Sequence, residues 1–187
     1  MRELQEAELN LQQADSHILY VFQDTEKYIN NALAFIKTGI ETGDFILVIE
    51  NERITVKLNE RLKACLSPED WKDVSFVSNF EFYYISDDFH VPSIISTFAR
   101  KLSPHLDQNR TVRTWAHVEW GARDDIASKI NSFEHLADEG VREMKVVSVC
   151  AYNERDVCER LEEKLCTSHQ FKMTDDEMKR SPIYLRK

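Results

Sequence analysis

The stretch from His17 to Glu50 constrains the fold more than any other part of the chain, because it has the pattern strand, turn, helix, turn, strand. Its ends, His17–Phe22 and Phe45–Ile49, are apolar runs rich in β-branched and aromatic residues, which are typical of buried strands. Between them Gly43 can end a helix, whose apolar face is predicted by Tyr28, Ile29, Leu33, Phe35, Ile36 and Ile40. Such a βαβ unit implies two parallel strands joined by a right-handed crossover.

The turn after the first strand tests for a nucleotide site, because many α/β proteins place a glycine-rich phosphate cradle there. Here the turn is Gln23-Asp24-Thr25-Glu26, which contains no glycine and two carboxylates that would repel a phosphate. Either Asp24 or Thr25 can instead cap the first amide groups of the following helix. We therefore expect no ATP or GTP at this turn.

Length and composition predict one domain. The chain has 187 residues, of which 42% are hydrophobic and 30% charged, enough for one sizeable core and short for two. The first residues carry an apolar stripe that includes Leu4 and Leu11 and predicts a helix. Because so short a helix is marginal alone, we expect it to dock on the domain or to pair with another copy in a homodimer. We divide the chain into this amino-terminal helix, 1–14, and a single domain, 15–187.

Charge and cysteine content exclude several classes of partner. The formal net charge is −9, whereas sequence-independent binding to nucleic acid or to anionic membranes needs clustered Lys and Arg. No apolar run approaches the roughly 20 residues that span a bilayer. We recognise no signal peptide, and the four cysteines form no CxxC pair. We therefore expect a cytoplasmic protein with reduced thiols that binds neither nucleic acid nor membranes.

Strand and helix patterns alternate along the rest of the chain. Further strands are expected at Trp71–Ser78, Thr111–Trp120 and Met144–Tyr152. Further helices are expected at Asn51–Leu66, His90–Leu106, Asp124–Ala137 and Val157–Cys166. This alternation, without repeats or linkers, predicts a three-layer α/β sandwich with a mostly parallel central sheet flanked by helices.

Two segments keep more than one interpretation. Phe80–Ile85, FEFYYI, is either a continuation of the preceding strand or an extended segment at its rim. Its aromatic residues cannot all face one core, so some should be exposed and offer a second route to self-association. The tail from His169 to Leu185 is interpreted as a final edge strand or a hairpin.

Side chains at the carboxyl ends of two expected strands form the first candidate site. Trp115, His117 and Glu119 alternate toward one face of their strand, and Tyr152 ends the strand that begins at Met144. Because the crevice of a parallel sheet opens at these ends, we expect the four to line one ligand pocket. His117 and Glu119 could face one metal ion, but the chain has no HxxxH, HExxH or CxxC motif. We expect neither a metal nor a cofactor.

Catalytic interpretations find little support in the sequence. A hydrolase needs a nucleophile with a base in reach, but there is no GxSxG elbow, and neither Ser78 nor Ser148 has such support nearby. The pair Glu134-His135 could mark a phosphorylatable histidine, although such a pair on a helix usually lies on a solvated face. We therefore expect no catalytic residues.

Several features occur together in a recognisable order: His17 opening the first strand, the paired turn glycines Gly39 and Gly43, the run Val149–Asn153 with its Cys-Ala-Tyr, and His169 before the last strand. This set resembles the MEDS family, the methanogen and methylotroph DcmR-type sensory domains, over roughly His17 to Met173. Family members often carry Asp where this chain has Asn153. The family is similar to RecA- and KaiC-type ATPase cores that have lost the phosphate loop, so the resemblance implies a RecA/KaiC-like fold with a degenerate P-loop.

The resemblance also implies a sensory module, for which some relatives are proposed to detect small hydrocarbon derivatives through the histidine and the cysteine. It adds His17, Cys150 and His169 to the candidate ligand-binding residues. This role needs His17 and Cys150 on neighbouring strands, on the same face of the sheet. The alternative is structural: His17 can hydrogen-bond a neighbouring backbone group, and Cys150 can be a small buried hydrophobic residue without a cation to lower its pKa.

We therefore expect a non-catalytic sensory or regulatory domain that binds a small apolar signal molecule, a signalling protein, or both. A histidine kinase, a transcription regulator and an anti-sigma component are the partner candidates. The alternative from another class is a RecA-like nucleotide-binding enzyme with an atypical phosphate site. A third interpretation is a structural interaction module that binds no small molecule.

Overall fold

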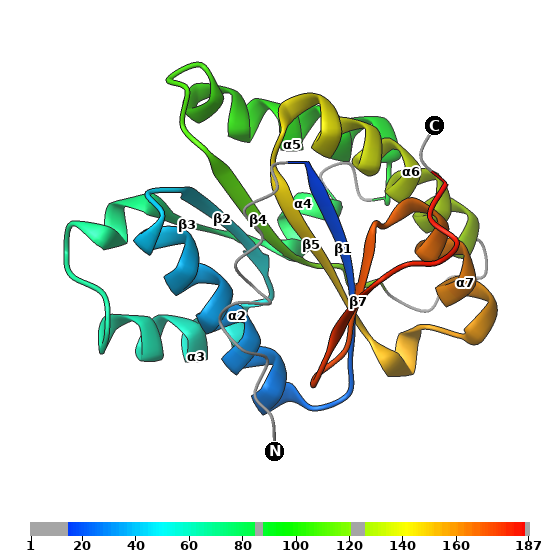
Figure 1. Ribbon diagram of the computed structural model, residues 1–187, viewed down its shortest axis with the longest axis horizontal. Coiled ribbons are helices and arrows are strands. Elements are labelled where there is room, and N and C mark those ends of the chain that lie inside the picture. Colours follow the sequence, from blue (N-terminus) through cyan, green and yellow to red (C-terminus); the bar gives the residue numbers. More distant parts are fainter. Residues whose placement is uncertain (1–14, 85–87, 121–125, 186–187) are drawn as a thin grey trace.

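A seven-stranded sheet, in the order β3-β2-β4-β5-β1-β6-β7, crosses the part of the protein that the computed structural model describes, residues 15–84, 88–120 and 126–185 (Figure 1). The strands are β1 Ser16–Phe22, β2 Phe45–Glu50, β3 Val74–Ser78, β4 Val112–His117, β5 Val147–Asn153, β6 Phe171–Met173 and β7 Met178–Arg180. All neighbours pair in parallel except β6 and β7, which form an antiparallel hairpin. The mostly parallel sheet and the hairpin in the tail are confirmed.

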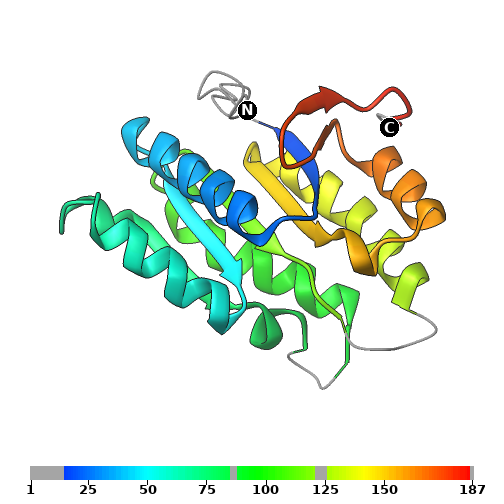
Figure 2. The ribbon, with the colours of Figure 1, turned by 90° about the horizontal axis from the view of Figure 1, so that it is seen from below.

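Helices cover both faces of this sheet, which gives the three predicted layers. They are α2 Thr25–Glu41, α3 Glu52–Lys63, α4 Asn79–Tyr83, α5 Val91–Leu106, α6 Ile126–Met144 and α7 Glu159–Ser168, with short 3-10 turns at Asp70–Asp73 and Glu154–Asp156. α2 and α3 pack on one face, whereas α4 to α7 pack on the other (Figures 1 and 2). Within the described part, no helix is both long and apolar enough to cross a membrane.

The strands alternate their side chains between the two layers of helices. In β1, Ile18 and Tyr20 pack toward α2 and α3, while Leu19 and Val21 pack toward α6 and α7. Because both faces are buried, the strand is a nearly continuous apolar run, as expected for a parallel sheet between helices. A polar side chain on such a strand can reach water only at a strand end.

The predicted βαβ unit forms with the expected cap. The Asp24 side chain accepts hydrogen bonds from the amides of Glu26 at 2.8 Å and Lys27 at 3.0 Å. Gly43 has a φ of +80°, a left-handed conformation that glycine adopts without strain, and it follows the end of α2. Gly39 does not belong to the turn: it lies inside α2, where a Cβ would approach the Ile46 side chain to 3.1 Å.

Two of the sequence-based boundaries are wrong. Phe80–Ile85 is neither a strand nor an extended rim, because Ser78 caps a short helix, α4, by accepting a hydrogen bond from the Glu81 amide at 3.4 Å. Phe80 is 70% exposed while Phe82 is buried, so the expected split of the aromatic residues does occur. Met144 ends α6 and does not begin β5. The predicted amino-terminal helix, 1–14, lies outside the described residues.

Candidate functional site

Four side chains with chemically versatile ends converge between the sheet and the helices α6 and α7. They are His17 on β1, Cys150 on β5, Glu134 on α6 and His169 directly after α7, and they are called the His-Glu-Cys-His cluster below. Each is buried, with at most 3% of its surface exposed. β1 and β5 are parallel neighbours, so that His17 Nε2 lies 3.4 Å from Cys150 Sγ. His17 and Cys150 therefore lie on one face, as the family resemblance requires.

Backbone carbonyls fix the orientation of both imidazoles in this cluster. His17 Nδ1 lies 2.9 Å from the carbonyl oxygen of Ser168, and His169 Nδ1 lies 2.7 Å from that of Leu165. Because a carbonyl only accepts, each Nδ1 must carry a proton, and each neutral ring then presents a lone pair at Nε2. These two Nε2 atoms lie 3.5 and 3.4 Å from the same oxygen, Glu134 Oε2.

The second oxygen of Glu134 is held separately, because Oε1 accepts a hydrogen bond from the Tyr152 hydroxyl. Within the described part of the chain, Glu134 Oε2 and His169 Nε2 have no hydrogen-bond partner although they are buried. Burying such atoms without partners is costly. The arrangement therefore invites something that both can bind, a proton or a cation.

Electrostatics sharpen this description. Burial raises the pKa of the Cys150 thiol well above its usual range, and the nearby Glu134 adds to the effect. Burial and the neighbouring His17 lower the pKa of His169. Burial alone would raise the pKa of Glu134, but His169, His17 and Tyr152 outweigh it, and the pKa falls. At neutral pH an ionised carboxylate therefore faces a protonated thiol and a neutral His169.

A second polar network lies at the carboxyl ends of β2 and β4. Glu50, fully buried, accepts hydrogen bonds from the Tyr28 hydroxyl and from His117 Nδ1, the latter at 2.6 Å. Trp115 Nε1 donates to the Tyr28 oxygen at 2.7 Å. His117 Nε2 lies 3.7 Å from Glu119 Oε1. His117 and Glu119 are thus brought together, as expected of two residues on one strand face, and with Glu50 they could approach one ion.

The expected single pocket of Trp115, His117 and Glu119 with Tyr152 does not form, and this expectation is corrected. Trp115 and His117 face α2 and its aromatic residues, whereas Tyr152 faces α6 on the opposite side of the sheet. The register explains the separation, because β4 and β5 pair Ala116, and not Trp115, with Cys150. Tyr152 joins the His-Glu-Cys-His cluster instead.

Sequence reasoning missed the two acidic residues of α6. Glu134 was expected on a solvated face, but its exposed fraction is 0%. Asp138, one turn later, is also buried and lies 3.5 Å from His17 Nδ1. A signal was present, since Glu134 and Asp138 interleave with the buried residues Ile130 and Ala137 on one helical stripe.

The turn after β1, the usual place of a phosphate cradle, is closed by the chain itself. Its backbone amides, those of Gln23 and Asp24, donate to Asp175 Oδ2 at 3.1 and 2.9 Å. Asp175 comes from the β6–β7 hairpin, and its other oxygen accepts from the Tyr20 hydroxyl at 2.8 Å. The adjoining cleft, of about 520 Å³, is lined by five acidic residues and two lysines: Asp24, Glu154, Glu162, Asp175, Asp176, Lys27 and Lys172. A carboxylate thus occupies the amides that a phosphate would need.

Comparison with known proteins places this geometry in context. The family model described as MEDS, the methanogen/methylotroph DcmR sensory domain, matches residues 16–170. Among curated proteins, none matches the chain. The match confirms the expected family resemblance.

Similar solved structures include an isolated ATPase domain, at a TM-score of 0.60 and 12% identity, with 87% of this chain and 69% of that chain covered. A DnaB-like replicative helicase, solved in a study of its interactions with primase, follows at 0.58 and 13%, with coverages of 87% and 47%. The KaiC-like protein PH0186 from Pyrococcus horikoshii OT3 has a TM-score of 0.58 and 13% identity, with coverages of 86% and 71%. The chain thus spans less than half of the helicase. At these identities the likeness concerns the fold, and it confirms the RecA/KaiC-like core.

The closed turn predicts that MgATP and MgGTP do not bind with micromolar affinity, which isothermal titration calorimetry can measure. Asp175→Ala should lower the unfolding free energy by about 1–3 kcal/mol, because two backbone amides and a buried hydroxyl lose their acceptor. The matched control is Asp176→Ala, whose exposed pair with Lys27 should contribute at most about 1 kcal/mol. Micromolar nucleotide binding by the unaltered chain would contradict this account of the turn.

The His117 network predicts a pH-dependent stability. Burial lowers the pKa of His117, but the carboxylates of Glu50 and Glu119 outweigh it, and the pKa is raised. A raised pKa stabilises the fold fully below the ordinary value of about 6.5, and this contribution is lost as the pH rises through the pKa of the folded state. His117→Gln should therefore lower the unfolding free energy by about 1.5–3 kcal/mol near pH 5.5 and by less at pH 9.

Urea unfolding of both proteins at each pH measures this difference. The control is His135→Gln on α6, at a half-buried position outside the network, where a change within about 0.5 kcal/mol is expected. A destabilisation by His117→Gln that stays constant from pH 5.5 to 9 would show that the charge of this histidine contributes nothing.

Proposed function

The chain belongs to the MEDS family of sensory domains, and we propose that it is a regulatory domain that binds a small, largely apolar molecule beside Cys150. The observation that carries the proposal is a cavity of about 20 Å³ enclosed between the sheet and the helices α4, α5 and α6. Its wall is almost entirely apolar, and the Cys150 side chain forms part of it. The candidate sensing cysteine therefore faces both the cavity and the His-Glu-Cys-His cluster.

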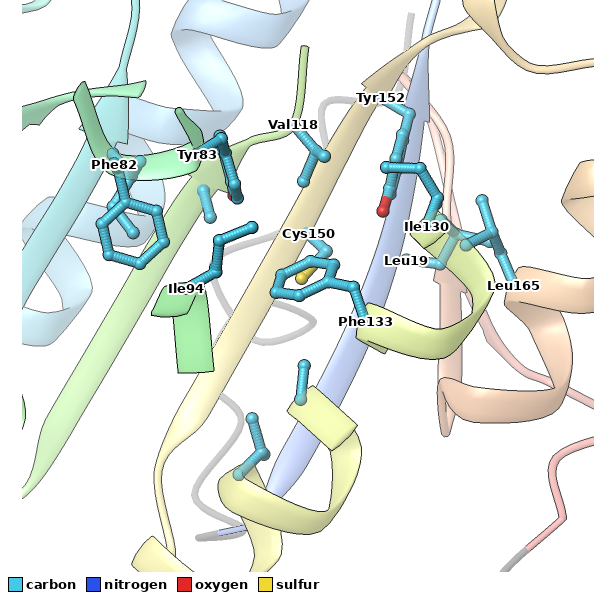
Figure 3. Close-up of a cluster of buried hydrophobic side chains, with 14 of the residues drawn as sticks. Leu19, Phe82, Tyr83, Ile94, Val118, Ile130, Phe133, Cys150, Tyr152 and Leu165 are labelled. Carbon is cyan, nitrogen blue, oxygen red and sulfur yellow. The ribbon is translucent and has the colours of Figure 1, made fainter. Parts of the chain in front are cut away.

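The cavity walls suit a hydrocarbon derivative. Phe82 of α4, Phe133 of α6 and Ala116 of β4 contribute apolar surface, and the Phe133 ring lies beside the Cys150 sulfur (Figure 3). Tyr83 also lines the cavity, and its buried hydroxyl has no hydrogen-bond partner among the described residues. A ligand with a small apolar body and one acceptor atom would fill the space and satisfy this hydroxyl.

Size limits the ligand further. A cavity of about 20 Å³ holds little more than one water-sized sphere, so an unexpanded site accepts roughly one or two carbon atoms. A one- or two-carbon alcohol, aldehyde or halide combines that size with an acceptor. Larger hydrocarbons would have to push α4 or α6 away from the sheet.

Helix α4 offers a route from this cavity to a partner protein. Phe82 and Tyr83 face the cavity, while Phe80 on the same short helix is exposed. A ligand that displaces α4 would therefore alter the surface that Phe80 presents. We propose that a signalling protein, such as a histidine kinase or a transcription regulator, responds to this surface. In this proposal the domain acts by binding and not by catalysis.

The alternative function, a nucleotide-binding enzyme, draws support from the ATPase titles of similar structures. It requires free backbone amides at the turn after β1, and Asp175 accepts hydrogen bonds from them. The apolar cavity requires no such rearrangement, so the sensory function is favoured.

The proposal predicts saturable binding of ethanol and of ethane, measured by chemical-shift changes of amides in β4, β5 and α6. Ala137→Leu should abolish both, because the larger side chain fills the cavity, whereas Ala64→Leu at an exposed position should leave both unchanged. Tyr83→Phe should weaken ethanol binding by about 1 kcal/mol, roughly fivefold, with ethane unaffected. Shift changes that never saturate, or that survive Ala137→Leu, would contradict a site in this cavity.

A further inference from the structure

We propose that the His-Glu-Cys-His cluster holds one divalent metal ion of the zinc type in tetrahedral coordination. The ligand atoms would be His17 Nε2, Glu134 Oε2, Cys150 Sγ and His169 Nε2. The inference goes beyond the sensory function, because it stands on the positions of these four atoms and holds whether or not a small molecule binds in the cavity.

The donor set selects the class of ion. Two imidazole nitrogens, a sulfur and one carboxylate oxygen suit zinc and related first-row metals. Magnesium and calcium prefer sites made of oxygen atoms alone. Because the four atoms belong to four separate elements of the fold, the chain carries no short metal motif. The absence of an HxxxH or CxxC spacing therefore does not argue against the site.

The distances match a tetrahedral site. Metal–nitrogen and metal–oxygen bonds of about 2.0–2.1 Å place neighbouring ligand atoms about 3.3 Å apart. Glu134 Oε2 lies 3.5 Å from His17 Nε2 and 3.4 Å from His169 Nε2, and His17 Nε2 lies 3.4 Å from Cys150 Sγ. All four ligand atoms lie within 4.8 Å of one another. Atoms at these separations can share one ion with small adjustments.

The surrounding hydrogen bonds prepare the same atoms for a metal. Metal-binding histidines usually donate their other ring N–H to a carbonyl or a carboxylate. Here both Nδ1 atoms do so, to the carbonyls of Ser168 and Leu165. The Tyr152 hydroxyl holds the remaining oxygen of Glu134, which leaves Oε2 free to coordinate.

An ion would also satisfy the two buried atoms, Glu134 Oε2 and His169 Nε2, that lack partners among the described residues. Binding forms a metal–sulfur bond as the Cys150 S–H bond breaks, and the proton leaves to solvent. The thiolate and the Glu134 carboxylate then balance the two positive charges of the ion. The buried site is electrically neutral in total, which removes most of the cost of burying the charges.

Metal analysis of the full-length chain tests the proposal without any small-molecule ligand. We expect about one zinc per chain after purification without chelators, by mass spectrometry of the elements. After removal of the metal, Co²⁺ should give the intense visible bands of tetrahedral cobalt and a near-ultraviolet sulfur-to-cobalt band. Cys150→Ser should remove the sulfur band, and Glu134→Gln should weaken zinc binding at least tenfold.

Two substitutions of the same kinds outside the cluster serve as controls. Cys158→Ser, at an exposed cysteine, and His135→Gln, next to Glu134 in sequence, should leave the metal content and the cobalt spectrum unchanged. Far-ultraviolet circular dichroism identifies variants that do not fold, and in that case the sulfur band of the unaltered chain decides. The proposal is overturned if the unaltered chain gives no sulfur-to-cobalt band, or if folded Cys150→Ser retains it. Loss of the metal in either control would also overturn it.

Discussion

Burial of both faces of a parallel sheet is the constraint on which the rest of this structure depends. Because helices lie on each side, polar side chains in the middle of β1, β4 and β5 are cut off from water and must find partners inside the protein. Each face meets this demand with one network. His117 and Glu50 belong to the network under α2, and His17 and Cys150 belong to the cluster under α6.

The two networks differ in how completely they are satisfied. Glu50 uses both of its oxygens, with Tyr28, His117 and the Asn51 amide as donors, so its carboxylate is well compensated. Glu134 directs one oxygen at two imidazole nitrogens and receives no hydrogen bond there from the described residues. A buried polar atom without a partner costs about 1–3 kcal/mol, a large part of a stability of about 5–15 kcal/mol. Such an arrangement fits a site kept for binding better than one kept for stability.

Local features of the fold could be predicted from the sequence, but contacts between distant segments could not. The Asp24 cap, the turn at Gly43 and the parallel sheet follow from periodicity and residue type. Strand register does not, and a shift of one residue moves every side chain to the other face. The pairing of Ala116 with Cys150 therefore decided against the expected pocket of Trp115 and Tyr152.

The same limit applies to the candidate site. His17, Cys150 and His169 were connected only through the family resemblance, since no local spacing joins them. Glu134 was missed because an acidic residue on a helix is usually solvated. Its place on the apolar stripe of α6 was visible in the sequence. The lack of open hydrogen-bond capacity at the turn after β1 was not visible, because Asp175 reaches it from the far end of the chain.

The central claim of this account is that Cys150 joins a buried ion and an apolar cavity in one sensing centre. The most direct test is the absorption spectrum of the cobalt-loaded chain during titration with ethanol. Because Cys150 lines the cavity and would coordinate the ion, the sulfur-to-cobalt band should shift and saturate together with the amide chemical shifts of the cavity. A band that stays fixed while the cavity fills would contradict the claim, and would show that the cluster and the cavity act separately.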